Sequence, residues 1–167
     1  MEDALGTKPP QGNGKGEVIM EKIKYIAYGS NLNLEQMAYR CPTAKVIGNA
    51  KLNGYELIFR GGNGGAVATV EKKKDSSVPV LVWELEPSDE AALDRYEGWP
   101  HFYRKEWVKV RMGKQWVKVM VYIMNDGRPL GSPSRYYYNT ILQGYNSAGF
   151  DSALLDDAVR KSAKQAL

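Results

Sequence analysis

The order of the strand-like runs is the feature that most constrains the fold of this chain. About six runs rich in β-branched and aromatic residues, each bounded by Gly, Pro, Asn or Asp, indicate strands. They lie at residues 23–28, 55–60, 66–71, 80–86, 103–112 and 116–124. Two amphipathic helical segments, residues 134–148 and 151–166, follow one another at the end of the chain and do not alternate with the strands. This order predicts an α+β fold and argues against a doubly wound nucleotide-binding sheet.

The first strand candidate ends at a short polar turn that leads directly into a helix-like segment. Residues 28–32 of this turn read Tyr-Gly-Ser-Asn-Leu. A strand–turn–helix junction of this kind aims several backbone N–H groups at one point, which suits a carboxylate or an oxyanion. We expect Gly29 to take a backbone conformation closed to other residues, Asn31 to tolerate a left-handed one, and Asn33 with Gln36 to cap the helix. Taken alone, the segment is equally compatible with a plain structural turn.

A second feature is an acidic residue at the end of a short helix. Ser88 is expected to cap this helix and Gly98 to end it, which makes Glu97 its last residue. A carboxylate there faces the negative end of the helix dipole, and aromatic neighbours add desolvation, so both effects raise its pKa. We expect Glu97 to face a cavity beside residues 28–32. A solvated glutamate at a frayed helix end is the alternative for this position taken alone.

Together the two segments resemble the γ-glutamylcyclotransferase superfamily, which includes the AIG2-like proteins. The marks of this family are a YGSNL-type loop, matched by residues 28–32, and an acidic residue in an L-D-x-x-E-G context, matched by residues 93–98. A looser match is to the family's P-S-x-x-Y segment, which begins here at Pro133. Two positions depart from the pattern, since Tyr145 stands where the family often has Ala and Phe150 where it often has Leu.

The resemblance implies a small mixed β-barrel of about six strands with peripheral helices. Residues 21–167 are expected to form this single domain, because the chain is long enough for one sizeable core. Residues 1–20 are expected to be a flexible tail, since the first stretch is rich in Gly, Pro, Lys and Asn and nearly lacks apolar side chains.

The resemblance also implies an enzyme that needs no cofactor. Such an enzyme, a cyclising acyltransferase or lyase linked to glutathione metabolism, releases 5-oxoproline from a γ-glutamyl amide when the substrate's own α-amino group attacks the γ-carbonyl. Glu97 would be the catalytic residue, first as general base and then as general acid. The implied substrate-binding residues are Tyr28, Gly29, Ser30, Asn31, Leu32, Tyr103 and Tyr136.

Composition bounds the location and the partners. The single cysteine, Cys41, excludes an internal disulfide and fits a reducing compartment. The sequence shows neither a signal peptide nor an apolar run long enough to cross a bilayer, so we expect a cytoplasmic protein without membrane contacts. The net charge of +4 comes from dispersed Lys and Arg, and the one run, residues 72–74, reads as a solvated turn. The expected partner is a small-molecule γ-glutamyl substrate and not a nucleic acid, and a homodimer stays possible.

Other chemistries lack the residues that they need. One His and one Cys at unrelated positions do not make a zinc site, so no metal is expected. His101 is more typical of a solvated loop, and Cys41 has no recognisable base beside it. The glycine-rich stretch at residues 61–65 lacks a P-loop ending and fits a hairpin connection or lid. A catalytically silent small-molecule binding protein that uses the same cavity is the alternative to the enzyme, whereas a basic nucleic-acid-binding barrel is disfavoured.

Overall fold

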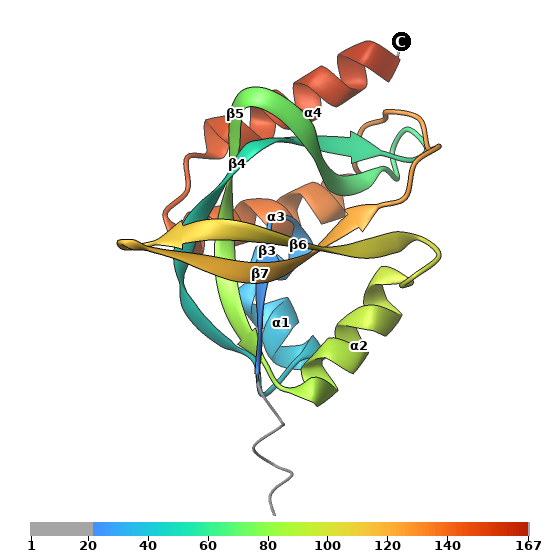
Figure 1. Cartoon of the computed structure of the whole chain (residues 1–167). Coiled ribbons are helices and arrows are strands. Elements are labelled where there is room, and N and C mark those ends of the chain that lie inside the picture. Colours follow the sequence, from blue (N-terminus) through green and yellow to red (C-terminus); the bar gives the residue numbers. More distant parts are fainter. Residues whose placement is uncertain (1–21, 167) are drawn as a thin grey trace, which may run out of the picture.

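The computed structural model describes residues 22–166, so the expected tail at residues 1–20 lies outside the described part of the chain. Figure 1 shows a bent mixed sheet with helices packed around it. The strands are β3 (Ile23–Ala27), β4 (Lys45–Arg60), β5 (Val67–Leu85), β6 (Tyr103–Met112) and β7 (Gln115–Met124). The helices are the 3₁₀ turn η2 (Ser30–Leu32), α1 (Leu34–Arg40), α2 (Pro87–Glu97), α3 (Arg135–Ala148) and α4 (Ser152–Ala166). The α+β class expected from the sequence is confirmed.

The sheet has five strands in the order β4-β5-β3-β7-β6 and is not a closed barrel within the described residues. β3 pairs parallel with β7, and the other neighbours pair antiparallel. The edge strands β4 and β6 meet through side chains, since a Cβ added to Gly48 would lie 2.7 Å from Met112 Cε. The expected barrel of about six strands is therefore not confirmed: its two edges approach each other without a hydrogen-bonded ladder between them.

Two of the expected strands turn out to be parts of one long strand. Residues 66–71 and 80–86 both map to β5, and the expected strand at residues 55–60 is the second half of β4. The lysines at residues 72–74, expected in a solvated turn, lie within β5 and are exposed there. Composition misled here because a charged exposed stretch of a hairpin carries no apolar alternation. The expected hairpin turn after β6 is confirmed, with Gly113 at φ 62° between paired Met112 and Gln115.

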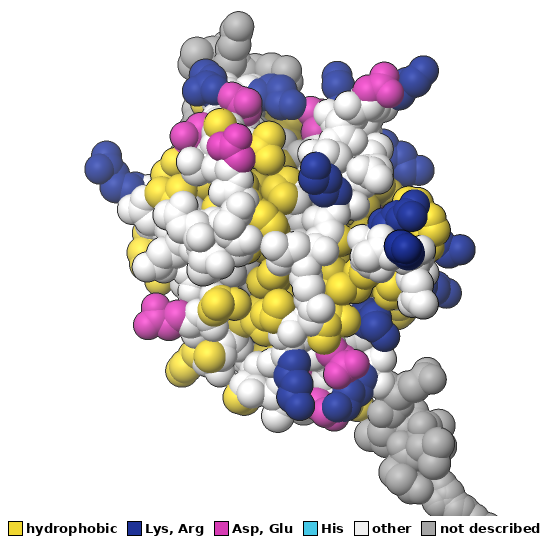
Figure 2. All heavy atoms as spheres, turned by 90° about the vertical axis from the view of Figure 1, so that its left-hand side faces the viewer, with side chains coloured by type: hydrophobic (Ala, Val, Ile, Leu, Met, Phe, Trp, Pro, Cys, Tyr) yellow, Lys and Arg dark blue, Asp and Glu magenta, His cyan; other side chains and the backbone are white. Residues whose placement is uncertain are grey.

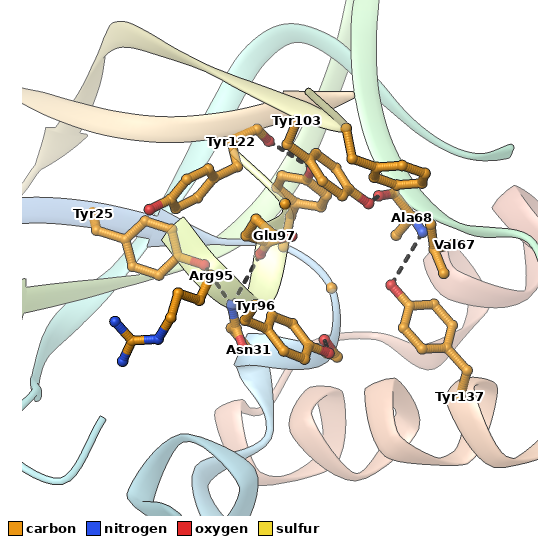
Figure 3. A pocket seen from close by; sticks show the side chains of 15 residues that line it. Tyr25, Asn31, Val67, Ala68, Arg95, Tyr96, Glu97, Tyr103, Tyr122 and Tyr137 are labelled. Atoms are coloured by element: carbon orange, nitrogen blue, oxygen red, sulfur yellow. Dashed lines mark hydrogen bonds between the residues drawn. The ribbon is translucent and has the colours of Figure 1, made fainter. Parts of the chain in front are cut away.

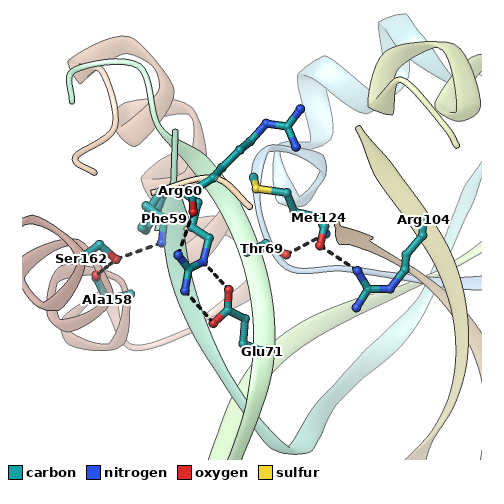
Figure 4. A network of polar contacts seen from close by, with 9 residues as sticks. Phe59, Arg60, Thr69, Glu71, Arg104, Met124, Ala158 and Ser162 are labelled. Carbon is teal, nitrogen blue, oxygen red and sulfur yellow. Dashed lines mark hydrogen bonds and ion pairs between the residues drawn. The ribbon is translucent and has the colours of Figure 1, made fainter. Parts of the chain in front are cut away.

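The central strand β3 is much shorter than its two neighbours. It has only five residues, and it pairs with the end of β5, from Ile23 opposite Leu85 to Ala27 opposite Leu81. Beyond Ala27 the flanking strands continue and converge, because the Thr69 hydroxyl of β5 accepts a hydrogen bond from Met124 N of β7 at 2.9 Å (Figure 4). The chain therefore leaves the sheet at Tyr28 in the middle of the molecule, and the gap that remains between β5 and β7 is where the candidate site forms.

Helix α3 supports the turn that follows β3. Ser134 caps this helix by accepting a hydrogen bond from Tyr137 N, and Gly149 ends it in a left-handed conformation. Gly144 faces η2 so closely that an added Cβ would lie 2.5 Å from Leu32 Cβ and 2.8 Å from Leu32 O. Only glycine fits at this crossing, because the nearest atoms include main chain that cannot turn aside.

Helix α4 packs on the outside of β4. Ser162, which is fully buried, accepts a hydrogen bond from Phe59 N at 2.9 Å and donates one to Ala158 O at 2.8 Å (Figure 4). On the neighbouring strand Arg60 forms an ion pair with Glu71 and donates to Arg128 O. These contacts fasten the end of β4 to both α4 and the segment that precedes α3.

The surface carries dispersed charge and several exposed aromatic side chains. On the face shown in Figure 2, Lys and Arg side chains lie scattered among acidic and apolar ones. Trp107 and Trp116, about half exposed, are covered by Lys118 and Arg111 respectively. Among the described helices, none is long and apolar enough to cross a membrane.

The close crossing at Gly144 predicts the effect of a methyl group there. Gly144→Ala should lower the free energy of unfolding by about 1–3 kcal/mol, because overpacking against main chain forces α3 and η2 apart. Urea denaturation followed by circular dichroism measures this change. Asn139→Ala, at an exposed position of the same helix, is the matched control and should stay within about 0.5 kcal/mol of the wild type. Equal stability of both variants would contradict the close crossing.

Candidate active site

A cavity of about 350 Å³ opens where β3 ends, between the 29–31 turn and the C-terminal end of α2 (Figure 3). Residues from six elements or their adjoining turns line it. The lining residues are Tyr25, Tyr28, Gly29, Ser30, Asn31, Val67, Ala68, Arg95, Tyr96, Glu97, Gly98, Phe102, Tyr103, Tyr122 and Tyr137. The lining is largely aromatic, and Glu97 and Arg95 are the charged groups on it. Such a cavity suits a small polar ligand held by a few directed hydrogen bonds.

The turn after β3 presents the start of the 3₁₀ segment to this cavity. Ser30 and Asn31 lie in its first turn, where backbone N–H groups have no carbonyl partner within the helix. Gly29 has φ −124°, so the closed backbone conformation expected for it is wrong. Glycine is required by space instead, since an added Cβ would lie 3.3 Å from Ala68 Cβ and 3.5 Å from the Tyr137 hydroxyl. A left-handed Asn31 is wrong too, because Asp75 is the only non-glycine residue with positive φ in the described range.

Both helices that flank the turn begin with a side-chain cap. Asn33 accepts a hydrogen bond from Gln36 N at 3.0 Å and so caps α1, as expected. α2 begins one residue earlier than expected, with Pro87 in its first turn and Glu86 as its N-cap in a capping box with Asp89. The expected cap at Ser88 is therefore wrong. Buried Asp89 also accepts hydrogen bonds from the Thr43 hydroxyl at 2.8 Å, which ties the start of α2 to the segment after α1.

The remainder of α2 is fixed on β6 and β7 by a polar cluster. Tyr122 donates a hydrogen bond to Asp94 at 2.6 Å. Lys105 forms ion pairs with Asp94 at 2.9 Å and with Glu90 at 2.7 Å, and its ammonium lies 4.1 Å from the ring centre of Trp99. Because these partners precede and follow the end of the helix, they set the position from which Glu97 reaches into the cavity.

Glu97 is the last residue of α2, as expected, and Gly98 ends the helix in a left-handed conformation. Its Oε2 atom accepts a hydrogen bond from Asn31 Nδ2 at 3.3 Å, so the carboxyl group lies beside the 29–31 turn (Figure 3). Burial raises the pKa of Glu97 to about 8, and the guanidinium of Arg40 opposes this rise. A carboxyl group with such a pKa exchanges protons near neutral pH, which is the property required of a general acid–base residue.

Two tyrosines use opposite ends of one peptide group (Figure 3). Tyr103 donates its hydroxyl hydrogen to Ala68 O at 2.7 Å, whereas Tyr137 accepts a hydrogen bond from Ala68 N at 3.1 Å. The Tyr103 oxygen can therefore only accept from a ligand, while the Tyr137 hydroxyl keeps a hydrogen to donate. Tyr28 resembles Tyr103, since it donates to Tyr122 O at 2.7 Å. Burial raises the pKa values of all three hydroxyl groups, which keeps them protonated.

The structure brings most of the predicted site residues to the cavity. Tyr28, Gly29, Ser30, Asn31, Glu97 and Tyr103 line it. Leu32 is fully buried behind the turn, against Gly144. Tyr136 is 75% exposed outside the cavity, where it accepts a hydrogen bond from Gln36, and the adjacent Tyr137 lines the cavity instead. The P-S-x-x-Y spacing counted from Pro133 reaches Tyr137, so strict counting would have found it.

Residues that the sequence argued against as catalytic groups also lie away from the cavity. Cys41 is buried, and burial raises its pKa to about 11, so its thiol stays protonated. His101 is exposed in the loop after α2. The 61–65 loop connects β4 to β5 as expected of a hairpin connection, and it is held by Gly61 N to Pro129 O and Gly64 N to Ser132 O. Among the described residues, no group of three or more His, Cys, Asp or Glu could hold a metal ion.

Comparison with known proteins places the chain among related sequences and structures. A family model described as "Gamma-glutamyl cyclotransferase, AIG2-like" matches residues 25–140. Proteins named γ-glutamylcyclotransferase from Bos taurus and Homo sapiens are each 33% identical to this chain over 85 residues, which cover 47% of this chain and 45% of theirs. The match thus spans less than half of these relatives. A solved structure named γ-glutamyl cyclotransferase has a TM-score of 0.71 and 27% identity, covering 83% of this chain and 86% of that one.

The buried position of Glu97 predicts a pH-dependent stability. The pKa of this carboxyl group rises from the ordinary value of 4.5 to about 8 on folding, so the folded state binds the proton more tightly and the free energy of unfolding falls as pH rises between these values. Glu97→Gln removes this penalty. The variant should therefore become more stable relative to the wild type from pH 5 to pH 8, by at most about 1.4 kcal/mol per pH unit.

Urea denaturation at several pH values measures this difference. Glu35→Gln, which changes an exposed glutamate of α1, is the matched control and should show no comparable trend. If the stability difference for Glu97→Gln were constant over this pH range, the carboxyl group could not be desolvated in the folded state.

Proposed function

This chain belongs to the γ-glutamyl cyclotransferase, AIG2-like family, and on that basis we propose that it is an enzyme that releases 5-oxoproline from a γ-glutamyl amide. The observation that carries the proposal is the Glu97 carboxyl group, which has a pKa near 8 and lies on the same cavity as the 29–31 turn. A raised acid pKa and a set of main-chain donors on one small cavity are what an internal acyl transfer needs. The proposed activity belongs to glutathione and γ-glutamyl metabolism in the cytoplasm.

The reaction closes a five-membered ring within the substrate. The α-amino nitrogen attacks the γ-carbonyl carbon, a new C–N bond forms, and the amide C–N bond to the leaving amine breaks. Because nucleophile and electrophile belong to one molecule, the enzyme has to hold a folded conformer and move protons. Neither water nor an added cofactor takes part in this atom balance.

Glu97 would move the protons. As a carboxylate it takes one from the α-ammonium group of the substrate, which is not a nucleophile while protonated, and as a carboxylic acid it delivers one to the leaving nitrogen. The α-amino group of a peptide has a pKa of about 7.7–8.0. A carboxyl group with a pKa of about 8 is therefore closely matched to it, and transfer costs little in either direction.

The remaining polar groups of the cavity would orient the γ-glutamyl group. The N–H groups at the start of η2 and the hydroxyl hydrogen of Tyr137 are donors and suit its carboxylate or the tetrahedral oxyanion. The oxygens of Tyr28 and Tyr103 are acceptors and suit its ammonium group. Donors and acceptors thus favour one orientation of a zwitterionic substrate.

The direct test of the proposal uses Glu97→Gln. This variant should lose about 10²–10⁴-fold in kcat because the amide cannot carry protons, while it keeps the shape of the cavity. The assay follows release of 5-oxoproline from a panel of γ-glutamyl dipeptides and γ-glutamyl amines, and calorimetry measures ligand binding by the same variant. Wild-type binding without turnover would favour the silent binding protein, and an active Glu97→Gln variant would assign the proton transfer to another residue.

A second prediction concerns the space at Gly29. Gly29→Ala should lower kcat/KM by about 10²-fold or more, because the methyl group presses on Ala68 and the Tyr137 hydroxyl and displaces the main-chain donors. Steady-state kinetics beside a thermal melt separates this effect from unfolding. Gly62→Ala is the matched control, since an added Cβ there meets nothing within 4 Å, and it should keep wild-type kinetics. A folded Gly29→Ala variant with normal kinetics would reduce the turn to a structural role.

A further inference from the structure

Arg40, the last residue of α1, contacts the site from outside the cavity. One guanidinium nitrogen donates a hydrogen bond to Asn31 Oδ1 at 2.6 Å, and another donates to Gln36 Oε1 at 3.1 Å. The guanidinium carbon lies 3.5 Å from the ring centre of Tyr96, so the planar cation stacks on this ring. Arg40 itself is absent from the cavity lining and is half-buried. It therefore touches neighbours of Glu97 without reaching the space for a ligand.

The contact with Arg40 decides which way the Asn31 amide faces. A guanidinium group has donors only, so the amide oxygen of Asn31 must point toward it. The NH₂ group must then point the opposite way, where it donates to the Tyr25 hydroxyl at 2.9 Å and to Glu97 Oε2 at 3.3 Å. Without a cation at this position the amide could turn and present its oxygen to Glu97. An oxygen there would accept a hydrogen bond only from the protonated carboxyl group and would stabilise that form.

The same residues form a closed ring of contacts. Arg40 binds Asn31, Asn31 binds Glu97, Glu97 follows Tyr96 in α2, and Tyr96 carries the stacked guanidinium of Arg40. The Tyr96 hydroxyl also pairs with Ser30 Oγ at 2.9 Å, which joins the turn to α2 a second time. Both halves of the site, the turn and the end of α2, are therefore held to one cation.

We propose that Arg40 is a positioning residue for the proposed reaction: it keeps the N–H group of Asn31 directed at Glu97 and, through Tyr96, fixes the end of α2 that carries Glu97. This inference rests on the proposed function for its catalytic meaning, but the geometry on which it depends exists without substrate. Arg40 acts through Asn31 and Tyr96 and touches neither the substrate nor the reacting atoms.

The charged and titratable groups around Glu97 make Arg40 the group to change. The hydroxyl groups that surround the carboxyl come from β3 and its turn, β6, β7 and α3, and they belong to Tyr25, Tyr28, Tyr103, Tyr122 and Tyr137. Burial raises all of their pKa values, so they stay neutral when Glu97 titrates. On α2 itself Asp94 is paired with Lys105, and Arg95 is exposed. Arg40 is the cation whose charge lowers the pKa of Glu97.

The test compares Arg40→Met, Arg40→Lys and the matched control Arg111→Met in the full chain. The control removes another stacked arginine, which lies over Trp116 on the β6–β7 hairpin. In Arg40→Met the acidic limb of kcat/KM should move upward by about 1 pH unit, and kcat should fall more than KM rises. Arg40→Lys restores the charge without the planar fork and should recover part of the shift. Arg111→Met should keep the wild-type profile.

Carbon-13 NMR of labelled glutamate carboxyls in the ligand-free protein provides a readout that does not depend on activity. The Glu97 signal is identified by its loss in Glu97→Gln, and its titration midpoint should rise in Arg40→Met. Asn31→Ala should raise it as well, and the double variant should shift by less than the sum, because both residues act through one amide. An unchanged midpoint in folded Arg40→Met would overturn the inference. A shifted midpoint in a protein that turns over no γ-glutamyl compound would instead reject the proposed function alone.

If Arg40→Met does not fold, Arg40→Lys and Asn31→Ala still decide the question. A purely structural role of Arg40 predicts lower melting temperatures with the Glu97 midpoint unchanged in both. The positioning role predicts a raised midpoint in Asn31→Ala and a smaller rise in Arg40→Lys.

Discussion

The site depends on the early end of the central strand. β3 stops at Ala27 while β5 and β7 on either side continue, so the chain must turn away inside the sheet. A turn in that place leaves backbone N–H groups that no neighbouring strand can pair, because the space across from them is a cavity. The 3₁₀ segment gathers these groups at its first turn, and Gly144 of α3 lets the segment sit low enough to be buried. A ligand with acceptor oxygens would complete the pairing that the sheet cannot supply.

The acid of the site is controlled by a balance between burial and one cation. Burial in an aromatic lining raises the pKa of Glu97, and Arg40 moderates that rise through Asn31. The polar cluster of Asp94, Lys105 and Tyr122 holds α2 in place on its other side without adding net charge beside Glu97. Removing water and supplying a distant cation are opposite terms, and together they leave the carboxyl group able to exchange protons near neutral pH.

Local signals in the sequence predicted local features, and tertiary contacts decided the rest. Glu97 before Gly98 and the cap at Asn33 were predictable because capping depends on neighbouring residues. The merging of two strand candidates into β5, the open sheet and the cap at Glu86 depended on pairing and packing between distant segments, which no local pattern encodes. The two departures from the family pattern, Tyr145 and Phe150, are now explained by packing, since their rings make an edge contact at 5.5 Å in the core.

The tyrosines show why residue type alone could not assign roles in the cavity. Tyr103 and Tyr137 are chemically identical, yet the Ala68 peptide group makes one an acceptor and the other a donor toward a ligand. This assignment comes from main-chain atoms of a third residue, so neither the side chain at position 68 nor the spacing between the tyrosines reveals it. Because burial keeps these hydroxyls neutral, they can orient a zwitterion without exchanging protons with it. Proton transfer near neutral pH is thereby confined to Glu97, the one lining carboxyl group.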